Sequence, residues 1–265
     1  MSAPFAPAVG APTVLELFAG IGGLSLGLER AGLRVVGQVE IKPFCRSVLA
    51  THWPEVPRHD DVRTAPEWWG ARPRPVVDVV AGGFPCQPFS TAGRRRGVAD
   101  ERWGWPWMAD VIRLVRPRYV LVENVAALLA DRDAFGWLLG DLAALGFDAE
   151  WGVFSACAVG APPHTRERLF LVAYTHRTDG RERLGSRREG RPVQEVDGGS
   201  SPWPHPVDGM LEAERGSSRV VDGVPDELEP SRVTALGNAV VPAVGEHFGR
   251  LILRDILTTR SAVAA

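Results

Sequence analysis

The sequence contains few cysteines and no long apolar run. Its 265 residues include only three cysteines, Cys45, Cys86 and Cys157, which are too few and too scattered for a disulfide framework. They form no CxxC pair or cysteine/histidine cluster, so we expect no metal site. No stretch approaches the roughly 20 apolar residues that span a bilayer. Residues 1–12 lack a basic start followed by an apolar core, so we expect a flexible arm there, not a signal peptide, and a cytoplasmic protein without a membrane partner.

The chain also lacks an excess of positive charge. Its formal net charge is −2 and its pI is near 6.3, so the whole molecule carries no electrostatic signature of nucleic-acid binding. Positive charge is local instead. Arg94, Arg95 and Arg96 are consecutive, and residues 177–191 hold six arginines against three acids. Such runs are also common in solvated loops, and they are where contacts to a polyanion would have to lie.

The sequence does contain an alternation of short apolar runs with segments of helical length. Helical segments are expected at 24–31 and 43–51, and an amphipathic helix at 242–257. Strands are expected at 13–18, 33–39, 76–81, 118–122, 148–157 and 169–174, with a strand end at 59–62. This order predicts parallel βαβ units and therefore an α/β fold with a Rossmann-like, doubly wound, mostly parallel sheet.

Polar residues and glycines follow several of these predicted strands. In an open parallel sheet the ligand lies outside the carboxyl ends of the strands, so these residues are expected to share one site. They are the glycine turn at 20–23, Glu40, Asp61, Pro85 with Cys86, and Glu123 with Asn124.

Taken singly, each of these features has an ordinary structural explanation. A glycine turn followed by an acid about 20 residues later is typical of a nucleotide-like cofactor site, but this turn is GxGG and not a full GxGxxG. Cys86 alone fits a small buried residue. Glu123 fits a helix cap, and Arg166 and Arg168 fit an exposed strand edge.

In combination, the motifs resemble those of the DNA (cytosine-5)-methyltransferases, in that family's order and along nearly the whole chain. LFAGIGGLSLGLERAG is similar to the first cofactor motif, VEIKPFC to the acidic second motif and GGFPCQPFS to the nucleophile motif. LVENVAALL resembles the Glu-Asn-Val motif, PPHTRERLFLVA the paired-arginine motif and ALGNAVVP the last cofactor motif. The resemblance implies a class I methyltransferase fold and S-adenosylmethionine as cofactor.

The resemblance also implies roles for catalytic residues. The Cys86 thiolate would add to C6 of cytosine, Glu123 would bind or protonate N3, and Arg166 and Arg168 would hold O2 of the base. A stacked base cannot be reached, so the target cytosine of double-stranded DNA would be flipped out.

Binding residues follow from the same resemblance. DNA contacts are expected on a mobile loop after the cysteine, at Gln87, Ser90, Arg94, Arg95 and Arg96. The cofactor pocket is expected to comprise Phe18, Ala19, Gly20, Gly22, Gly23, Glu40, Ile41, Asp61, Val62, Pro85, Asn238 and Val240.

The sequence departs from the family pattern in three places. His164 stands where the paired-arginine motif usually has glutamine, and Gly160 lies one residue further from the arginines. Glu16 replaces the common aspartate of the first motif, a change we expect to be tolerated. Only 44 residues separate Tyr174 from Arg219, so the target-recognition region, assigned to 175–231, is a small loop-rich insertion in a catalytic domain of 13–174 plus 232–265.

Three other functions are compatible with parts of the sequence. Transfer-RNA cytosine-5 methyltransferases share these motifs and are the nearest alternative, which the arginine-rich insertion mildly disfavours. A NAD-dependent oxidoreductase would leave Cys86, Glu123 and the arginine pair unexplained. A non-catalytic nucleic-acid-binding module would not need the cysteine and the glutamate. The leading interpretation is a monomeric DNA methyltransferase of restriction-modification or phage type, with a restriction endonuclease as its possible partner.

Overall fold

The computed structural model describes residues 10–85, 103–155, 167–175 and 235–264. These residues form one seven-stranded sheet in the order β3-β2-β1-β4-β5-β7-β6. Strands β1 to β5 are parallel to their neighbours, whereas β7 runs antiparallel to both β5 and β6. The predicted α/β fold with a mostly parallel sheet is therefore confirmed. Because the chain order reverses between β1 and β4, their carboxyl ends open at the position where such sheets bind ligands.

Helices and strands alternate along the first half of the chain. The strands are β1 (Thr13–Leu17), β2 (Arg34–Val39), β3 (Arg58–His59), β4 (Val79–Gly82), β5 (Tyr119–Val125), β6 (Phe147–Ser155) and β7 (Glu167–Thr175). The α-helices are α1 (Gly23–Arg30), α2 (Pro43–His52), α3 (Ala65–Gly70), α4 (Trp105–Val115), α5 (Arg132–Ala144) and α7 (Pro242–Ala264). Two 3-10 helices, η1 (Val62–Thr64) and η4 (Ala126–Ala130), precede α3 and α5.

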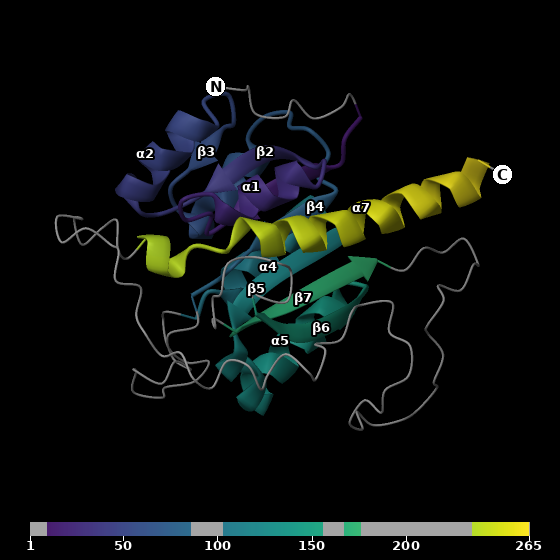
Figure 1. The fold of residues 1–265 in the computed structure, drawn as a ribbon. Coiled ribbons are helices and arrows are strands. Elements are labelled where there is room, and N and C mark those ends of the chain that lie inside the picture. Colours follow the sequence, from purple (N-terminus) through teal and green to yellow (C-terminus); the bar gives the residue numbers. More distant parts are fainter. Residues whose placement is uncertain (1–9, 86–102, 156–166, 176–234, 265) are drawn as a thin grey trace, which may run out of the picture.

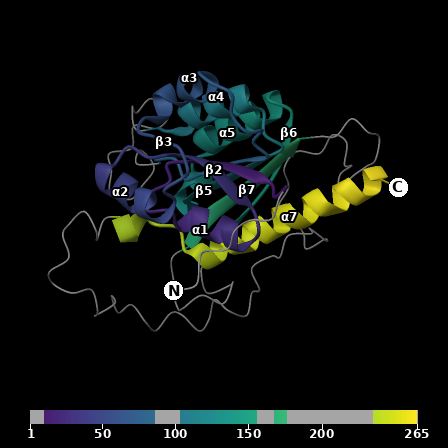
Figure 2. The same ribbon diagram turned by 90° about the horizontal axis from the view of Figure 1, so that it is seen from above.

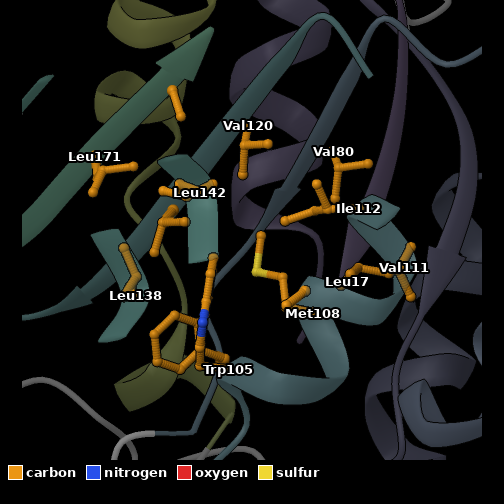
Figure 3. Packing of buried hydrophobic residues seen from close by; sticks show 14 of the residues in the cluster. Leu17, Val80, Trp105, Met108, Val111, Ile112, Val120, Leu138, Leu142 and Leu171 are labelled. Atoms are coloured by element: carbon orange, nitrogen blue, oxygen red, sulfur yellow. The ribbon is translucent and has the colours of Figure 1, made fainter. Parts of the chain in front are cut away.

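Helices cover the sheet on both faces (Figures 1 and 2). Helices α3, α4 and α5 lie on one face, and α1 and α7 lie on the other. Each face has its own apolar cluster. In the first cluster Trp105, Met108 and Ile112 of α4 pack against Val80 and Val120 of the central strands (Figure 3). Central strands covered on both faces must be apolar throughout, which explains the uninterrupted runs in the sequence.

Glycines bring α1 and α7 into close contact. A side chain at Gly27 would collide with the backbone at the start of α7. A Cβ at Gly249 would lie 2.6 Å from that of Ala31. Small residues at these positions let the two helices pack almost backbone to backbone. The last helix is thereby fixed beside the first, although more than 200 residues separate them in sequence.

The structure corrects several predicted boundaries. Strand β5 runs to Val125, so Glu123 and Asn124 lie within it and not after it, and Glu123 caps no helix. Arg168 likewise lies inside β7. Strand β4 begins at Val79, and α7 continues to Ala264. The β5 extension arises because β7 pairs with it as far as Val125, and sequence alone does not reveal this partner. In the described ranges no helix has the length and apolar character that crossing a membrane requires.

Candidate active site

The glycine turn at 20–23 joins β1 to α1 at the carboxyl edge of the sheet. Gly20 and Gly22 have φ of 56° and 85°, values that glycine adopts without strain. A Cβ at Gly22 would lie 2.5 Å from the ring of Trp53. At Gly20, in contrast, a Cβ would meet no atom of the described residues within 4 Å. Trp53 therefore packs against the turn at Gly22, whereas the turn leaves space for a ligand at Gly20.

Glu40, directly after β2, holds this turn in place. Its carboxylate accepts hydrogen bonds from the backbone N–H of Gly20 at 2.7 Å and of Lys42 at 2.8 Å. Ala19 is fixed to the same strand by its N–H, which donates to the carbonyl of Val39 at 3.0 Å. Phe18, just before the turn, has a φ of 54°, which is uncommon for a residue with a side chain. Such strain is frequently found at functional sites.

One of the other predicted cofactor residues contacts the turn directly. The main chain of Val240 lies directly against Gly23, which has no room for a Cβ. Asn238 is exposed close by in the chain, and Ile41 beyond β2 is 62% exposed. Val62 is buried at the start of η1. The structure thus groups residues from both ends of the chain around one edge of the sheet.

Asp61 is already engaged by a neighbouring cation. Its carboxylate caps η1 by accepting from the backbone N–H of Arg63 at 2.9 Å, and it pairs with the guanidinium of the same residue. These hydrogen bonds from the Arg63 side chain hold the pKa of Asp61 below its ordinary value. A ligand that uses the Asp61 side chain would share it with Arg63.

The segment that precedes Cys86 is held at two carbonyl groups. The side-chain amide of Asn124 donates to the carbonyl of Phe84 at 3.1 Å, and the N–H of Gly104 donates to that of Pro85 at 3.2 Å. The buried ring of Phe84 packs against the rings of Trp103 and Trp105. The approach to the predicted nucleophile is consequently a fixed turn.

Glu123 and Arg168, two of the predicted catalytic residues, form an ion pair. Glu123 is 9% exposed, and its Oε1 lies 3.2 Å from Nε of Arg168 on the paired strand. Its Oε2 lies so near Gly83 that a Cβ there would be 2.6 Å away. A pocket opens beside the pair, lined by Glu123, Phe154, Arg168, Phe170, Val240 and Val244. The pocket therefore connects this pair to the segment that contacts the glycine turn.

Several predicted residues lie outside the described residues. They are Cys86, Arg166, Gln87, Ser90, Arg94, Arg95 and Arg96. Other residues have clear positions that sequence reasoning did not assign. Gly83 and Trp53 support the site through close packing, and no sequence signal distinguishes them from ordinary turn and helix-end residues. Asn124 did carry a signal, because it is part of the Glu-Asn-Val motif.

The reversal of strand order at β1 and β4, the glycine turn there and the pairing of buried Glu123 with Arg168 fit a class I methyltransferase fold with a cofactor cradle. The model of the C-5 cytosine-specific DNA methylase family matches residues 12–199. The chain belongs to this family, whose members use S-adenosylmethionine.

Individual relatives agree with this assignment. The chain is 35% identical over 167 residues to the type II methyltransferase M.BsuFI of Bacillus subtilis, covering 61% of this chain and 39% of the relative. It is 39% identical over 170 residues to M.Eco47II of Escherichia coli, covering 61% and 39%. The chain thus spans about two fifths of the length of these curated relatives. The structure of the Entamoeba histolytica methyltransferase EhMeth superposes with a TM-score of 0.60 at 14% identity, covering 93% of this chain and 99% of that one, which supports the fold alone.

Proposed function

We propose that this protein is a DNA (cytosine-5)-methyltransferase that acts on a cytosine flipped out of double-stranded DNA. The observation that carries the proposal is the Glu123–Arg168 pair in a pocket lined also by Val240, whose main chain abuts the glycine turn. The predicted nucleophile follows Pro85 directly in sequence, and Gly83 of the same turn touches Glu123. A cytosine in this pocket would therefore lie between the cofactor cradle and the catalytic groups.

S-adenosylmethionine, when bound, supplies an electrophilic methyl group on a sulfonium. The residues that would hold it are Phe18, the glycine turn, Glu40 and the segment at 238–240. The open side of Gly20 and the carboxylate of Glu40 beside it fit a nucleoside with ribose hydroxyls.

The chain's own residues would activate the base. The Cys86 thiolate adds to C6, while Glu123 binds or protonates N3 and makes the ring a better acceptor. Arg168, with Arg166, holds O2 and balances charge in the adduct. Once C5 carries the transferred methyl group, loss of its proton to a base restores the C5–C6 double bond and expels Cys86 as the thiolate. Base flipping gives these groups access to the ring.

The expected DNA contacts are Gln87, Ser90, Arg94, Arg95 and Arg96, and the proposed recognition region is 175–231. The named relatives are type II methyltransferases, so we place this protein in a restriction-modification or phage setting. A cognate endonuclease is then its expected partner, the cytoplasm its expected location and a monomer its expected state.

Methylation mapping tests the proposal. Purified protein is incubated with S-adenosylmethionine and unmethylated DNA, and 5-methylcytosine is located by bisulfite sequencing, with transfer RNA as a parallel substrate. We expect methylation of DNA, a covalent complex with DNA that carries 5-fluorocytosine, and neither product from the Cys86→Ala variant. Methylation of transfer RNA alone would make the protein an RNA methyltransferase. Methylation by the alanine variant would refute the role of Cys86.

A further inference from the structure

A buried polar cluster lies beneath the glycine turn, separate from the residues assigned above. It contains Glu16 of β1, Ser25 of α1 and Gln38 of β2. These side chains are 2%, 0% and 0% exposed, respectively. Glu16 and Gln38 are register partners on adjacent parallel strands, so their side chains emerge side by side on one face of the sheet. Three polar groups removed from water in this way need a structural reason, because burial of polar groups is unfavourable.

Hydrogen bonds connect the cluster to the first turn of α1. The hydroxyl of Ser25 is hydrogen-bonded to the carboxyl of Glu16. This contact also opposes the effect of burial on the pKa of Glu16. The side-chain amide of Gln38 donates to Oγ of Ser25 at 3.0 Å. Glu16 of β1 therefore holds the start of α1 at Ser25, and Gln38 of β2 supports this contact.

The start of α1 needs such an anchor. Its N-cap residue is Gly22, which has no side chain and makes no side-chain cap hydrogen bond. The first N–H groups of a helix lack partners within the helix and are usually satisfied by the cap side chain. Glu16 instead holds the first turn from outside the helix, through the hydroxyl of Ser25, and an oxygen acceptor there also suits the positive end of the helix dipole.

We propose that Glu16, supported by Ser25 and Gln38, is a positioning residue that holds the glycine turn in its cofactor-binding conformation. Glu40 fixes the entrance of the turn at Gly20, and Glu16 fixes its exit at Ser25. The two carboxyls thus act at opposite ends of the same short loop. Glu16 itself is buried below the turn and touches no reacting group. The identity of the ligand rests on the proposed function. The role of Glu16 in holding the turn does not depend on it.

Burial, reinforced by nearby carboxylates, raises the pKa of Glu16. Glu40 and Glu29 are the ionisable groups that act on it, and both raise its pKa. On its other side β4 presents Ala81, which carries no charge. Burial and these carboxylates together favour the protonated acid, whose carbonyl oxygen still accepts from the Ser25 hydroxyl. Glutamine keeps such an acceptor oxygen and carries no charge.

Calorimetric titration with S-adenosylhomocysteine at pH 7 tests the proposal. We expect Glu16→Ala to weaken binding about tenfold or more, because the start of α1 loses its acceptor. Glu16→Gln should bind within about threefold of wild type. With saturating cofactor and DNA, kcat of the alanine variant should stay within about threefold of wild type while KM for the cofactor rises. Ser25→Ala removes the hydroxyl that Glu16 holds, so it should weaken binding by a similar factor.

Tyr119→Phe is the matched control. It removes a partly buried hydrogen bond, from Tyr119 to Asp255 at 2.5 Å, at the amino end of β5. This variant should lose stability and keep its affinity. Unchanged affinity in Glu16→Ala, or an equal loss in Tyr119→Phe, would overturn the proposal.

Hydrogen exchange provides a readout that does not depend on the proposed function. Without any ligand, the amides of residues 20–26 should exchange about tenfold faster in Glu16→Ala than in wild type and Glu16→Gln. If wild type binds no S-adenosylhomocysteine, the proposed function fails, and exchange alone decides the anchoring. Equal exchange in all three proteins would refute it.

Discussion

Replacing Glu16 with glutamine should change how the stability of the fold depends on pH. Burial, followed by the nearby carboxylate of Glu40, raises the pKa of Glu16 from 4.5 to about 8, although hydrogen bonds from Ser25 oppose the shift. In the unfolded chain the same group titrates near its ordinary value. Between these two pH values the folded protein keeps a proton that the unfolded chain has lost. Stability must therefore fall as the pH rises through this window.

The magnitude follows from the two pKa values. Each pH unit in the window lowers the free energy of unfolding by about 1.4 kcal/mol. Full ionisation of Glu16 in the folded state thus opposes folding by about 5 kcal/mol, as an order of magnitude. Below pH 4.5 and above about pH 8 both states carry the same charge at this position, so the slope due to Glu16 disappears. A neutral glutamine contributes no slope anywhere.

Urea denaturation followed by tryptophan fluorescence measures this effect. The free energy of unfolding is determined for wild type and Glu16→Gln at half-unit intervals from pH 5 to pH 9. We expect the difference between them to grow in favour of glutamine by several kcal/mol across the series. The control Glu55→Gln, at an exposed position, should show a nearly constant difference from wild type. A constant difference for Glu16→Gln as well would mean that Glu16 is ionised at neutral pH, and the reasoning above would be wrong.

Three further variants test the packing around the site. Gly83→Ala places a methyl group 2.6 Å from Oε2 of Glu123, so single-turnover methylation should slow about tenfold or more while cofactor affinity in calorimetry is kept. Gly27→Ala forces α1 away from the backbone of α7 and should lower the free energy of unfolding by about 1–3 kcal/mol in urea titrations. Asn124→Ala leaves the Phe84 carbonyl without its donor and should destabilise the fold by a similar amount. It should also slow the trapping of 5-fluorocytosine DNA, and normal trapping would show that this hydrogen bond does not orient the nucleophile turn.

The sequence predicted the central part of the fold well. Strands β1, β2, β4 and β5 are buried on both faces, so their apolar runs stand out from the polar turns around them. The glycine turn and Glu40 were also recognisable, because a tight turn requires glycine and the acid lies at a fixed distance along the chain. Features that depend on local backbone geometry and burial can therefore be predicted from the sequence.

Features that depend on contacts between distant residues were harder to predict. The extension of β5 through Glu123 and Asn124 depends on its pairing with β7, about 45 residues later. The role of Gly83 depends on a carboxylate from the neighbouring strand. Glu16 looked like a tolerated replacement for aspartate, and its contact with Ser25 becomes apparent only when α1 folds over β1. In each case the partner is set by the tertiary structure, and periodicity gives no information about it.

The extension of β5 explains why Glu123 and Asn124 must be adjacent. Successive side chains of a strand point to opposite faces of the sheet. Glu123 faces the pocket beside Val240 and Val244, on the side covered by α7, whereas Asn124 reaches the carbonyl of Phe84, whose ring belongs to the other apolar cluster. One strand thus holds the proposed catalytic carboxyl on one face and fixes the segment before the proposed nucleophile from the other. Had the strand ended at Val122, this alternation would not be enforced, so the pairing with β7 is what gives the two residues their separate positions.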